Sequence, residues 1–336
     1  MMTGRLYIDG KDAYTVYGVY VVDTGWNELI AMPPLKTVES NDWQEEDGVE
    51  VDLSEPVLDT RTVQIRFALT YAYSRYFALV KALSDGAYHT FDCTHIGRTY
   101  RLRLVGVGSF AAADILGEAT LKFADDFPLE SHRDHLPEST IIPNDRFQLD
   151  SVPFSDYGIH VLQGSLSEIV KTPEVKPNLT RTFAAQSGAI YDSKRVTFKS
   201  KDVKLSCLMR AETLEELWNN YDALLYHLIR PEERLLWVDD LERDFACYYK
   251  QCTVNEFYPE DRIWLRFELT LTFTRDFRIT DDDMVLASED NIIIFTEDGT
   301  CAIELLPDRY KYPTFRFVNN KSTLRMTSSN NIRFNN

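Results

Sequence analysis

The sequence predicts a mainly β protein made of two tandem split β-barrel or sandwich modules, with one helix per module, followed by a small C-terminal β region. Three observations predict this. Several segments alternate apolar and polar residues with a period of two, as strands with one buried face do. Aromatic residues, which favour strands, make up 12% of the 336 residues. The succession of strands, helix and strands also occurs twice along the chain.

The first module is expected within residues 1–128. Its predicted elements are strands at 6–9 and 19–22, an alternating strand at 63–69, a helix from about 74 to 85 and a strand at 100–104. Ser74 is the expected N-cap of the helix and Gly86 its stop. The helical side chains expected to face the sheet are Tyr76, Phe77, Val80 and Leu83.

The second module is expected within residues 147–279 and has the clearer pattern. Thr213 and Glu216 form a capping-box pattern, and Pro231 ends the predicted helix. The apolar stripe of this helix consists of Leu214, Leu217, Trp218, Tyr221, Leu224, Leu225 and Leu228. Residues 263–273 then alternate apolar and polar side chains over the whole segment, which predicts a long strand.

The two modules resemble each other in sequence. Tyr17-Gly18-Val19 matches Tyr157-Gly158-Ile159, and the match continues without a gap to residue 69. Identical pairs along it include Glu28 with Glu168, Pro33 with Pro173, Lys36 with Lys176, Gly48 with Gly188 and Val63 with Val203. The closing segments 121–127 and 271–277 also match, after a longer middle part in the second module. Two unrelated β domains of similar composition are the alternative, because strand patterns resemble one another easily.

Two further segments complete the expected organisation. Residues 129–146 contain prolines and mixed charges and are predicted to be a linker. Residues 284–336 are predicted to form the small β region. There, Glu297-Asp298-Gly299 separates two strand-like segments, at 291–296 and 301–306, as in a hairpin.

Composition excludes several classes of function. The net charge is −17, from 53 acidic and 36 basic residues, and such a surface repels nucleic-acid phosphates. The charge does not exclude a wall that DNA slides past without adhering. No run of eighteen apolar residues predicts a membrane span, and the N-terminus lacks the apolar core of a signal peptide.

No residues are predicted to be catalytic, cofactor-binding or metal-binding. The five cysteines contain no CxxC pair, and His89 with His95 or the HxxH at 132–135 is a weak metal signal. Phosphate-loop and GxSxG patterns are absent from the sequence. We therefore expect a protein that is not an enzyme and needs no cofactor.

The acid-rich segment 41–60, which has no Lys or Arg, is the candidate interaction arm. Its candidate residues are Asp42, Glu45, Glu46 and Asp47, with Trp26 and Trp43 flanking them. The matching segment 181–200 is neutral to basic, so the two arms are expected to face different neighbours or each other. A solvated loop and core tryptophans are the plainer alternatives.

Several of these residues together resemble the N-terminal domain of siphophage distal tail proteins. They are Tyr17-Gly18, Gly25-Trp26-Asn27-Glu28-Leu29, Pro33, the segment 41–53 and the closing segment 123–127. The resemblance implies a split β-barrel with one helix that assembles into a ring, typically a hexamer, around the DNA channel. The ring joins the tail tube to the hub and the receptor-binding proteins. Such a protein belongs to the virion and is assembled in the host cytoplasm.

The chain departs from that family in carrying the module twice. Related tail-hub proteins carry two similar barrels, so that a trimer imitates six-fold symmetry. The expected function is therefore a structural protein of a phage tail tip or baseplate, acting as a trimeric or hexameric ring. The alternative is a carbohydrate- or receptor-binding β protein, because exposed Trp and Tyr also stack on sugars.

Overall fold

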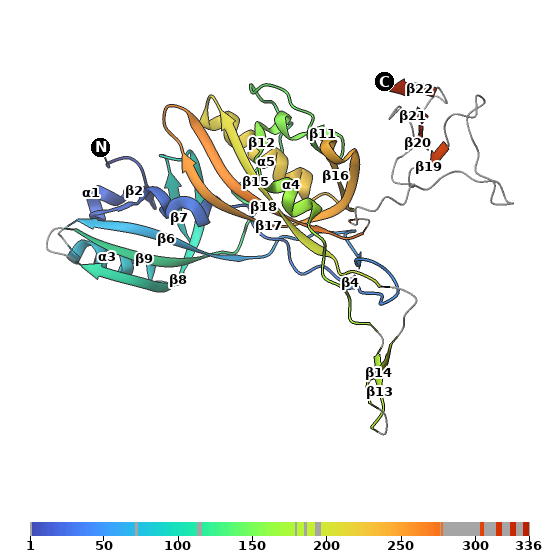
Figure 1. Ribbon diagram of the computed structural model, residues 1–336. Helices are drawn as coiled ribbons and strands as arrows, with labels where there is room; N and C mark the ends of the chain where they lie inside the picture. Colours follow the sequence, from blue (N-terminus) through green and yellow to red (C-terminus); the bar gives the residue numbers. More distant parts are fainter. Residues whose placement is uncertain are drawn as a thin grey trace. The chain divides into compact units, whose positions relative to one another are not determined.

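The computed structural model describes residues 2–70, 73–112, 116–178, 180–184, 187–191, 196–275 and 277, and four short strands beyond residue 300. The chain divides into two compact units, Met1–Phe277 and Arg278–Asn336. Both seven-stranded sheets belong to the first unit (Figure 1). The mainly β fold predicted from the sequence, with curled antiparallel sheets, is confirmed.

The first sheet, with its helices, is called module 1. Its strands follow one another in the order β2-β1-β7-β8-β9-β6-β3 and are all antiparallel. The strands are β1 (Tyr7–Ile8), β2 (Lys11–Asp12), β3 (Val19–Val21), β6 (Arg61–Thr70), β7 (His89–Cys93), β8 (Arg98–Ala112) and β9 (Leu116–Asp125). The helices are α1 (Ala13–Tyr17), α2 (Asn27–Ile30) and α3 (Tyr73–Leu83), with a 3₁₀ turn at Asp23–Trp26. A separate hairpin, β4 (Ser40–Asn41) with β5 (Glu50–Val51), forms the arm of module 1.

The second sheet, with its helices, is called module 2, and its order is β11-β10-β16-β17-β18-β15-β12. The strands are β10 (Phe147–Leu149), β11 (Val152–Pro153), β12 (Ile159–Val161), β15 (Lys201–Ala211), β16 (Arg234–Val238), β17 (Arg243–Tyr258) and β18 (Ile263–Phe273). The helices are α4 (Ser165–Val170) and α5 (Leu214–Leu228), with 3₁₀ turns at Phe154–Tyr157 and Asp239–Leu241. The arm of module 2 is the hairpin of β13 (Thr180–Thr182) and β14 (Ala189–Tyr191).

The two sheets have the same topology and the same register. Val19 of β3 pairs with Leu69, and Ile159 of β12 pairs with Met209. Isolated bridges at the base of each arm, Leu35 with Leu58 and Val175 with Phe198, also match. Each of these residues in module 1 is paired by the gapless sequence match with the residue named in module 2.

The closing strands correspond differently from the sequence match. Val63 pairs with Phe123, and its counterpart Val203 pairs with Leu271. Phe123 and Leu271 are therefore equivalent, whereas the sequence match placed Leu121 opposite Leu271. A shift of two residues keeps the same face of the strand buried, which is why the apolar pattern hid it.

Smaller features repeat as well. The register of β8 against β9 shifts between Leu104 and Gly106, and that of β17 against β18 shifts between Tyr249 and Gln251. The extra residues at these bulges are Val105 and Lys250. The long strands of both modules therefore bend at the same place.

The helices follow the predicted patterns with two corrections. α5 begins after Thr213, whose hydroxyl accepts a hydrogen bond from the Glu216 N–H at 3.1 Å. Ser74, the expected N-cap, is the second residue of α3, which begins at Tyr73. The other correction concerns the buried face of α3. In α3, Tyr76 is buried but Phe77 is 57% exposed, contrary to the expectation that both face the sheet. The buried face of α3 is set by Tyr76, Leu79 and Leu83, at helical spacings of three and four, and Phe77 lies to one side of it.

The second unit contains an antiparallel meander of β19 (Ile303–Leu305), β20 (Thr314–Phe317), β21 (Thr323–Met326) and β22 (Ile332–Asn335). The strand β19 lies inside the predicted segment 301–306. The other half of the predicted hairpin, 291–296, lies outside the described residues.

Candidate assembly surface: the joint between the modules

Module 1 binds module 2 through the base of its arm and through α2. The Leu35 N–H donates to the Lys250 carbonyl of β17 at 2.9 Å, and the Asn27 side-chain amide donates to the Asn255 carbonyl at 2.8 Å. The Tyr221 hydroxyl of α5 donates to the Ile30 carbonyl at 3.0 Å. These hydrogen bonds therefore connect α2 and the base of the first arm to β17 and α5 of module 2.

The sequence-predicted arm residues divide into three groups. Asp42 forms an ion pair with the buried Lys176 at 2.5 Å, and Asp47 accepts the Phe198 N–H at 2.9 Å, so both acidic residues bind module 2. Glu45, Glu46 and Trp43 lie at the surface, where Trp43 is 52% exposed and donates to Glu50 at 3.1 Å. Trp26 is 4% exposed and packs in the core of module 1.

Lys176 is the central cation of the joint. Its side chain is 1% exposed, and its ammonium donates to the carbonyls of Trp43 at 2.6 Å and Gly48 at 2.7 Å, in addition to the Asp42 ion pair. Burying an ammonium is costly unless it is paired and hydrogen-bonded, and the arm supplies both. The acidic arm thus completes a site that module 2 presents.

Gly48 allows the closest approach of the arm to module 2. Its N–H donates to the Phe198 carbonyl at 2.7 Å, and the next N–H, of Val49, donates to the Thr274 carbonyl at 2.8 Å. A Cβ at Gly48 would lie 1.7 Å from the Thr274 carbonyl oxygen, and the backbone there has φ +76°. Only glycine fits this position.

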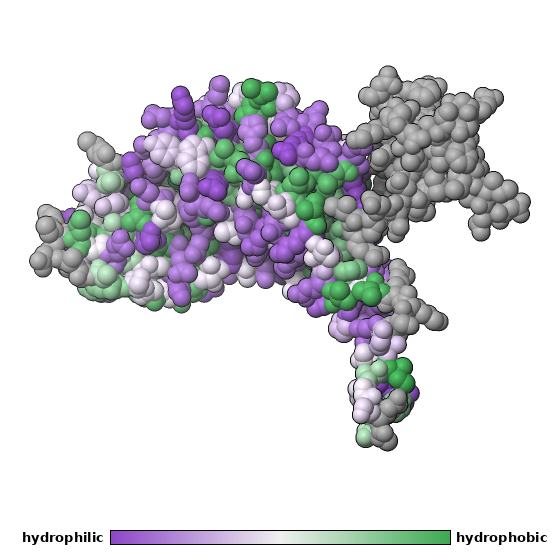
Figure 2. Space-filling model, in the orientation of Figure 1, coloured by the Kyte–Doolittle hydropathy of each residue, from purple (hydrophilic) through white to green (hydrophobic). Residues whose placement is uncertain are grey.

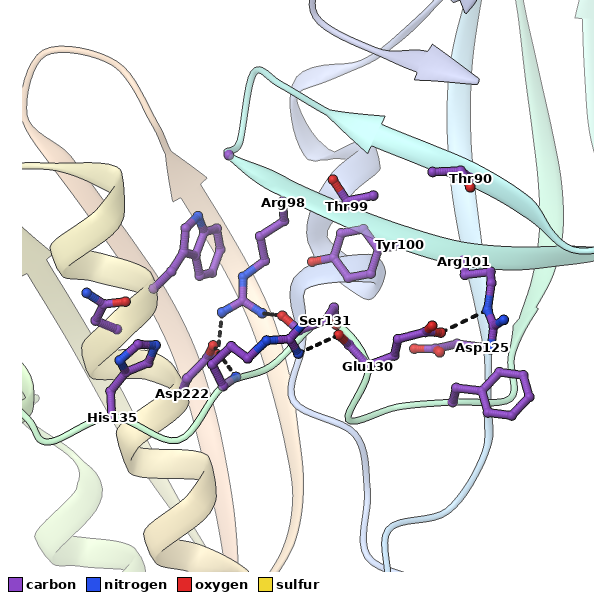
Figure 3. A pocket seen from close by; sticks show the side chains of 15 residues that line it. Thr90, Arg98, Thr99, Tyr100, Arg101, Asp125, Glu130, Ser131, His135 and Asp222 are labelled. Carbon is purple, nitrogen blue, oxygen red and sulfur yellow. Dashed lines mark hydrogen bonds and ion pairs between the residues drawn. The ribbon is translucent and has the colours of Figure 1, made fainter. Parts of the chain in front are cut away.

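A buried polar cluster forms a second part of the joint, beside a pocket of about 470 Å³ (Figure 3). Arg98 of β8 forms an ion pair with Asp222 of α5, and its Nη1 donates to the Ser131 carbonyl at 2.9 Å. The guanidinium also lies over the Trp218 ring, 4.3 Å from its centroid. His132 Nδ1 lies 2.7 Å from the Asp222 carboxylate. The cluster therefore ties β8 and the segment after β9 to α5.

The charges in this cluster set one another's protonation. Burial lowers the pKa of His132 below its usual value, and the nearby Arg98 acts in the same direction against the hydrogen bond to Asp222. Burial by itself raises the pKa of Asp222, but His132 and Arg98 outweigh it and hold that pKa below the usual range. At neutral pH we infer a carboxylate that accepts from an arginine and from a neutral imidazole.

The sequence does not single out these buried residues. His132 stands out there only as part of an HxxH pattern, yet its side chain is 2% exposed and contacts α5. The segment 129–146, predicted as a linker, also lies against α5, where the Glu138 N–H donates to Asn220 at 2.8 Å. The available signal was the position of Asp222, four residues after Trp218 and three before Leu225, which places a charged residue on the buried side of the helix.

Neither the protein-family models nor the curated proteins match this sequence. Among solved structures, the chain is similar to the SPP1 Dit (gp 19.1) protein, called a paradigm of the hub adsorption apparatus in phages that infect Gram-positive bacteria. The two share 13% identity over 81% of this chain and 98% of the other, with a TM-score of 0.28.

None of the helices among the described residues has the length and apolar character needed to cross a membrane. Within the same part of the chain, no three His, Cys, Asp or Glu side chains converge as metal ligands do.

The joint can be described as contact between two kinds of face. The arm face of a module consists of its short helix, the segment after it and its arm: α2, Leu35 and β4–β5 in module 1. The strand face consists of the long bulged strand and the arm-base lysine: β17 and Lys176 in module 2. The arm face of module 1 binds the strand face of module 2, so the contact is head-to-tail.

Proposed function

We propose that this chain is a structural protein of a bacteriophage tail tip, which assembles into a trimeric or hexameric ring around the DNA channel. The ring connects the tail tube to the hub and the receptor-binding proteins, and it belongs to the virion after assembly in the host cytoplasm. The resemblance of the segments 17–53 and 123–127 to distal tail proteins is what supports the phage context.

The observation that carries the proposal is the head-to-tail joint between two modules of the same topology. A heterologous contact, in which unlike surfaces meet, generates a ring when its rotation closes. The chain already contains one such contact. A protein built in this way is suited to assembly.

The charge of the chain supports a channel role. With a net charge of −17, the protein repels a phosphate backbone and can let DNA pass without adhering. The cluster around Arg98 and Asp222 also supports a structural role, because its charged groups bind one another across the joint.

Native mass spectrometry and negative-stain electron microscopy of the full-length protein test this proposal. We expect species of three or six chain masses and rings with a central opening. A chain that stays monomeric at all accessible concentrations and binds an immobilised glycan would overturn the proposal in favour of the sugar- or receptor-binding alternative. A tape-measure reading frame just upstream of the gene is the arrangement that the proposal expects.

A further inference from the structure

Module 2 has an arm face, and module 1 has a strand face made of Lys36 and of β8 from its bulge at Val105 onward. Neither the arm face of module 2 nor this part of β8, which lies beyond Arg98, takes part in the joint described above. The positions equivalent to the joint follow from the shared register. Ile30 and Leu35 of the bound arm face correspond to Val170 and Val175. On the strand side, the bulge and the pairing with β9 or β18 make Lys250 equivalent to Val105 and Cys252 equivalent to Val107. The free faces can therefore be compared with the bound ones position by position.

The free faces expose apolar side chains where the bound faces bury theirs. Ile30 is 2% exposed and Cys252 8%, whereas their counterparts Val170 and Val107 are 43% and 54% exposed. Val175 is 53% exposed, whereas its counterpart Leu35 is partly buried. Val105 is 46% exposed, and its counterpart Lys250 is exposed as well, so at this position the free face differs in being apolar. Further exposed apolar residues lie on the arm of module 2 and on β8: Phe183, Ile190, Tyr191 and Phe110. Several exposed apolar side chains on one face are typical of an interaction site.

The arm of module 2 stands apart from both sheets in Figure 1, and hydrophobic (green) surface appears on it in Figure 2. All six residues of β13 and β14 are exposed. Gly188 retains the glycine and the positive φ, +96°, of its counterpart Gly48, although nothing lies within 4 Å of the position its Cβ would take. The feature that lets the first arm approach module 2 is thus present in the second arm with no surface against it.

The strand face of module 1 has retained the matching lysine. Lys36 is equivalent to Lys176, because their N–H groups donate to the equivalent carbonyls of Val57 and Thr197. Lys176 is buried under the first arm, whereas Lys36 is exposed. If the arm of a module 2 were seated on module 1, the backbone carbonyls of the turn at Gly188 could accept hydrogen bonds from Lys36.

A buried hydroxyl provides an independent observation. Tyr76, Leu79 and Leu83 of α3 correspond to the buried Tyr221, Leu224 and Leu228 of α5. The Tyr221 hydroxyl donates to the arm face of module 1, at the Ile30 carbonyl. The Tyr76 hydroxyl is buried and has no hydrogen-bond partner among the residues that the structure describes. A buried polar group of this kind requires an explanation, and the missing acceptor corresponds to the Val170 carbonyl.

We propose that the arm face of module 2 binds the strand face of module 1 in a second copy of this chain, and so repeats between chains the joint that exists within each chain. The Val175 N–H then donates to the Val105 carbonyl, Val170 packs against Val107, and Lys36 binds the glycine turn of the incoming arm. The inference rests on the proposed ring, whose chain-to-chain contact it specifies.

Crosslinking of two single-cysteine proteins tests the pairing. The four described cysteines are buried, and Cys301 is replaced by serine in every variant. Val175→Cys and Val105→Cys are prepared separately, mixed and treated with a short bis-maleimide. We expect crosslinked dimers in the mixture and none with either protein alone, because the contact joins unlike faces. A Val16→Cys protein, 44% exposed on α1, is the matched control and should give no dimer with Val175→Cys.

Complementation of two assembly-defective variants tests the same contact without a crosslinker. Val170→Asp and Val107→Asp each place a charge on one free face and leave the other intact. Each alone should lose the ring and remain a folded monomer by native mass spectrometry. Their mixture should give dimers and no larger species, because only one compatible pair of faces remains. Val16→Asp should assemble as the unmodified chain does.

The outcomes separate this inference from the proposed function. Rings that persist in both aspartate variants, or a mixture that never crosslinks although rings form, would overturn the inference and leave the ring standing. Crosslinked dimers formed by Val175→Cys alone would also overturn it, since they indicate like faces meeting. If the unmodified chain forms no oligomer, the proposed function itself fails.

Discussion

Removing the Asp222 carboxylate should be among the most destabilising single changes in the first unit. In Asp222→Ala the Arg98 guanidinium, whose side chain is 5% exposed, loses its ion-pair partner, and His132 loses its acceptor. Breaking a buried ion pair from one side destabilises a protein by about 3–5 kcal/mol, because it leaves an uncompensated buried charge. Domain stabilities are about 5–15 kcal/mol, so this loss is a large share of the total.

A double variant separates the ion pair from the packing. Arg98→Met with Asp222→Leu removes both charges and keeps apolar volume, and such replacements are often neutral or stabilising. We expect the double variant to be more stable than Asp222→Ala by at least about 2 kcal/mol. Asp240→Ala, which breaks the exposed Arg146–Asp240 pair, is the control, with an expected loss below about 1 kcal/mol.

Urea unfolding followed by far-ultraviolet circular dichroism measures these differences. A loss of unfolding free energy below about 1 kcal/mol for Asp222→Ala would mean that the Arg98–Asp222 pair contributes no more than an exposed ion pair does. That result would refute the view that the cluster holds the joint together. A double variant that loses the sum of its two single losses would refute the coupling of Arg98 with Asp222.

Three further predictions compare matched positions or vary the pH. Tyr221→Phe should lower the unfolding free energy by about 1 kcal/mol, because it leaves a buried carbonyl unpaired, whereas Tyr76→Phe should leave the monomer unchanged in thermal unfolding and weaken ring assembly. Gly48→Ala should prevent the arm from docking and lower the melting temperature by several degrees, whereas Gly188→Ala, free of contacts, should lose only about 1 kcal/mol through its positive φ. Because the pKa of His132 is lowered in the folded protein, the unfolded chain takes up a proton on this imidazole at a higher pH than the folded chain does. The free energy of unfolding should therefore fall as the pH drops below about 6.5, and His132→Gln should remove that part of the pH dependence. Equal pH profiles for the two proteins would contradict the lowered pKa of His132.

The sequence predicts the fold well wherever burial is periodic. In a strand with one buried face every second side chain is buried, and in an amphipathic helix every third or fourth. The strands β15 and β18 and the helix α5 follow from such patterns, and so does the likeness of the two modules. Periodicity does not fix register to better than a multiple of two. For this reason the match of Leu121 with Leu271 was two residues from the equivalence that the pairing shows.

The joint was only partly predictable. The sequence analysis left open whether the two arms face different neighbours or each other. In the structure, Asp42 and Asp47 of the first arm contact Lys176 and Phe198 at the base of the second arm. The partners Arg98 and His132 could not be found in the same way. Their burial depends on contacts between segments far apart in the chain, and a polar side chain in a sequence carries no mark of what will cover it.

Because module 1 is covalently joined to module 2, half of the seams in any closed ring form inside single chains. Those seams are made during folding and do not depend on protein concentration, since the tether holds the two partners at a high effective concentration. Only the other half require encounters between separate molecules. A ring of this kind needs fewer association steps than one of the same size made of single modules, and it always contains an even number of modules.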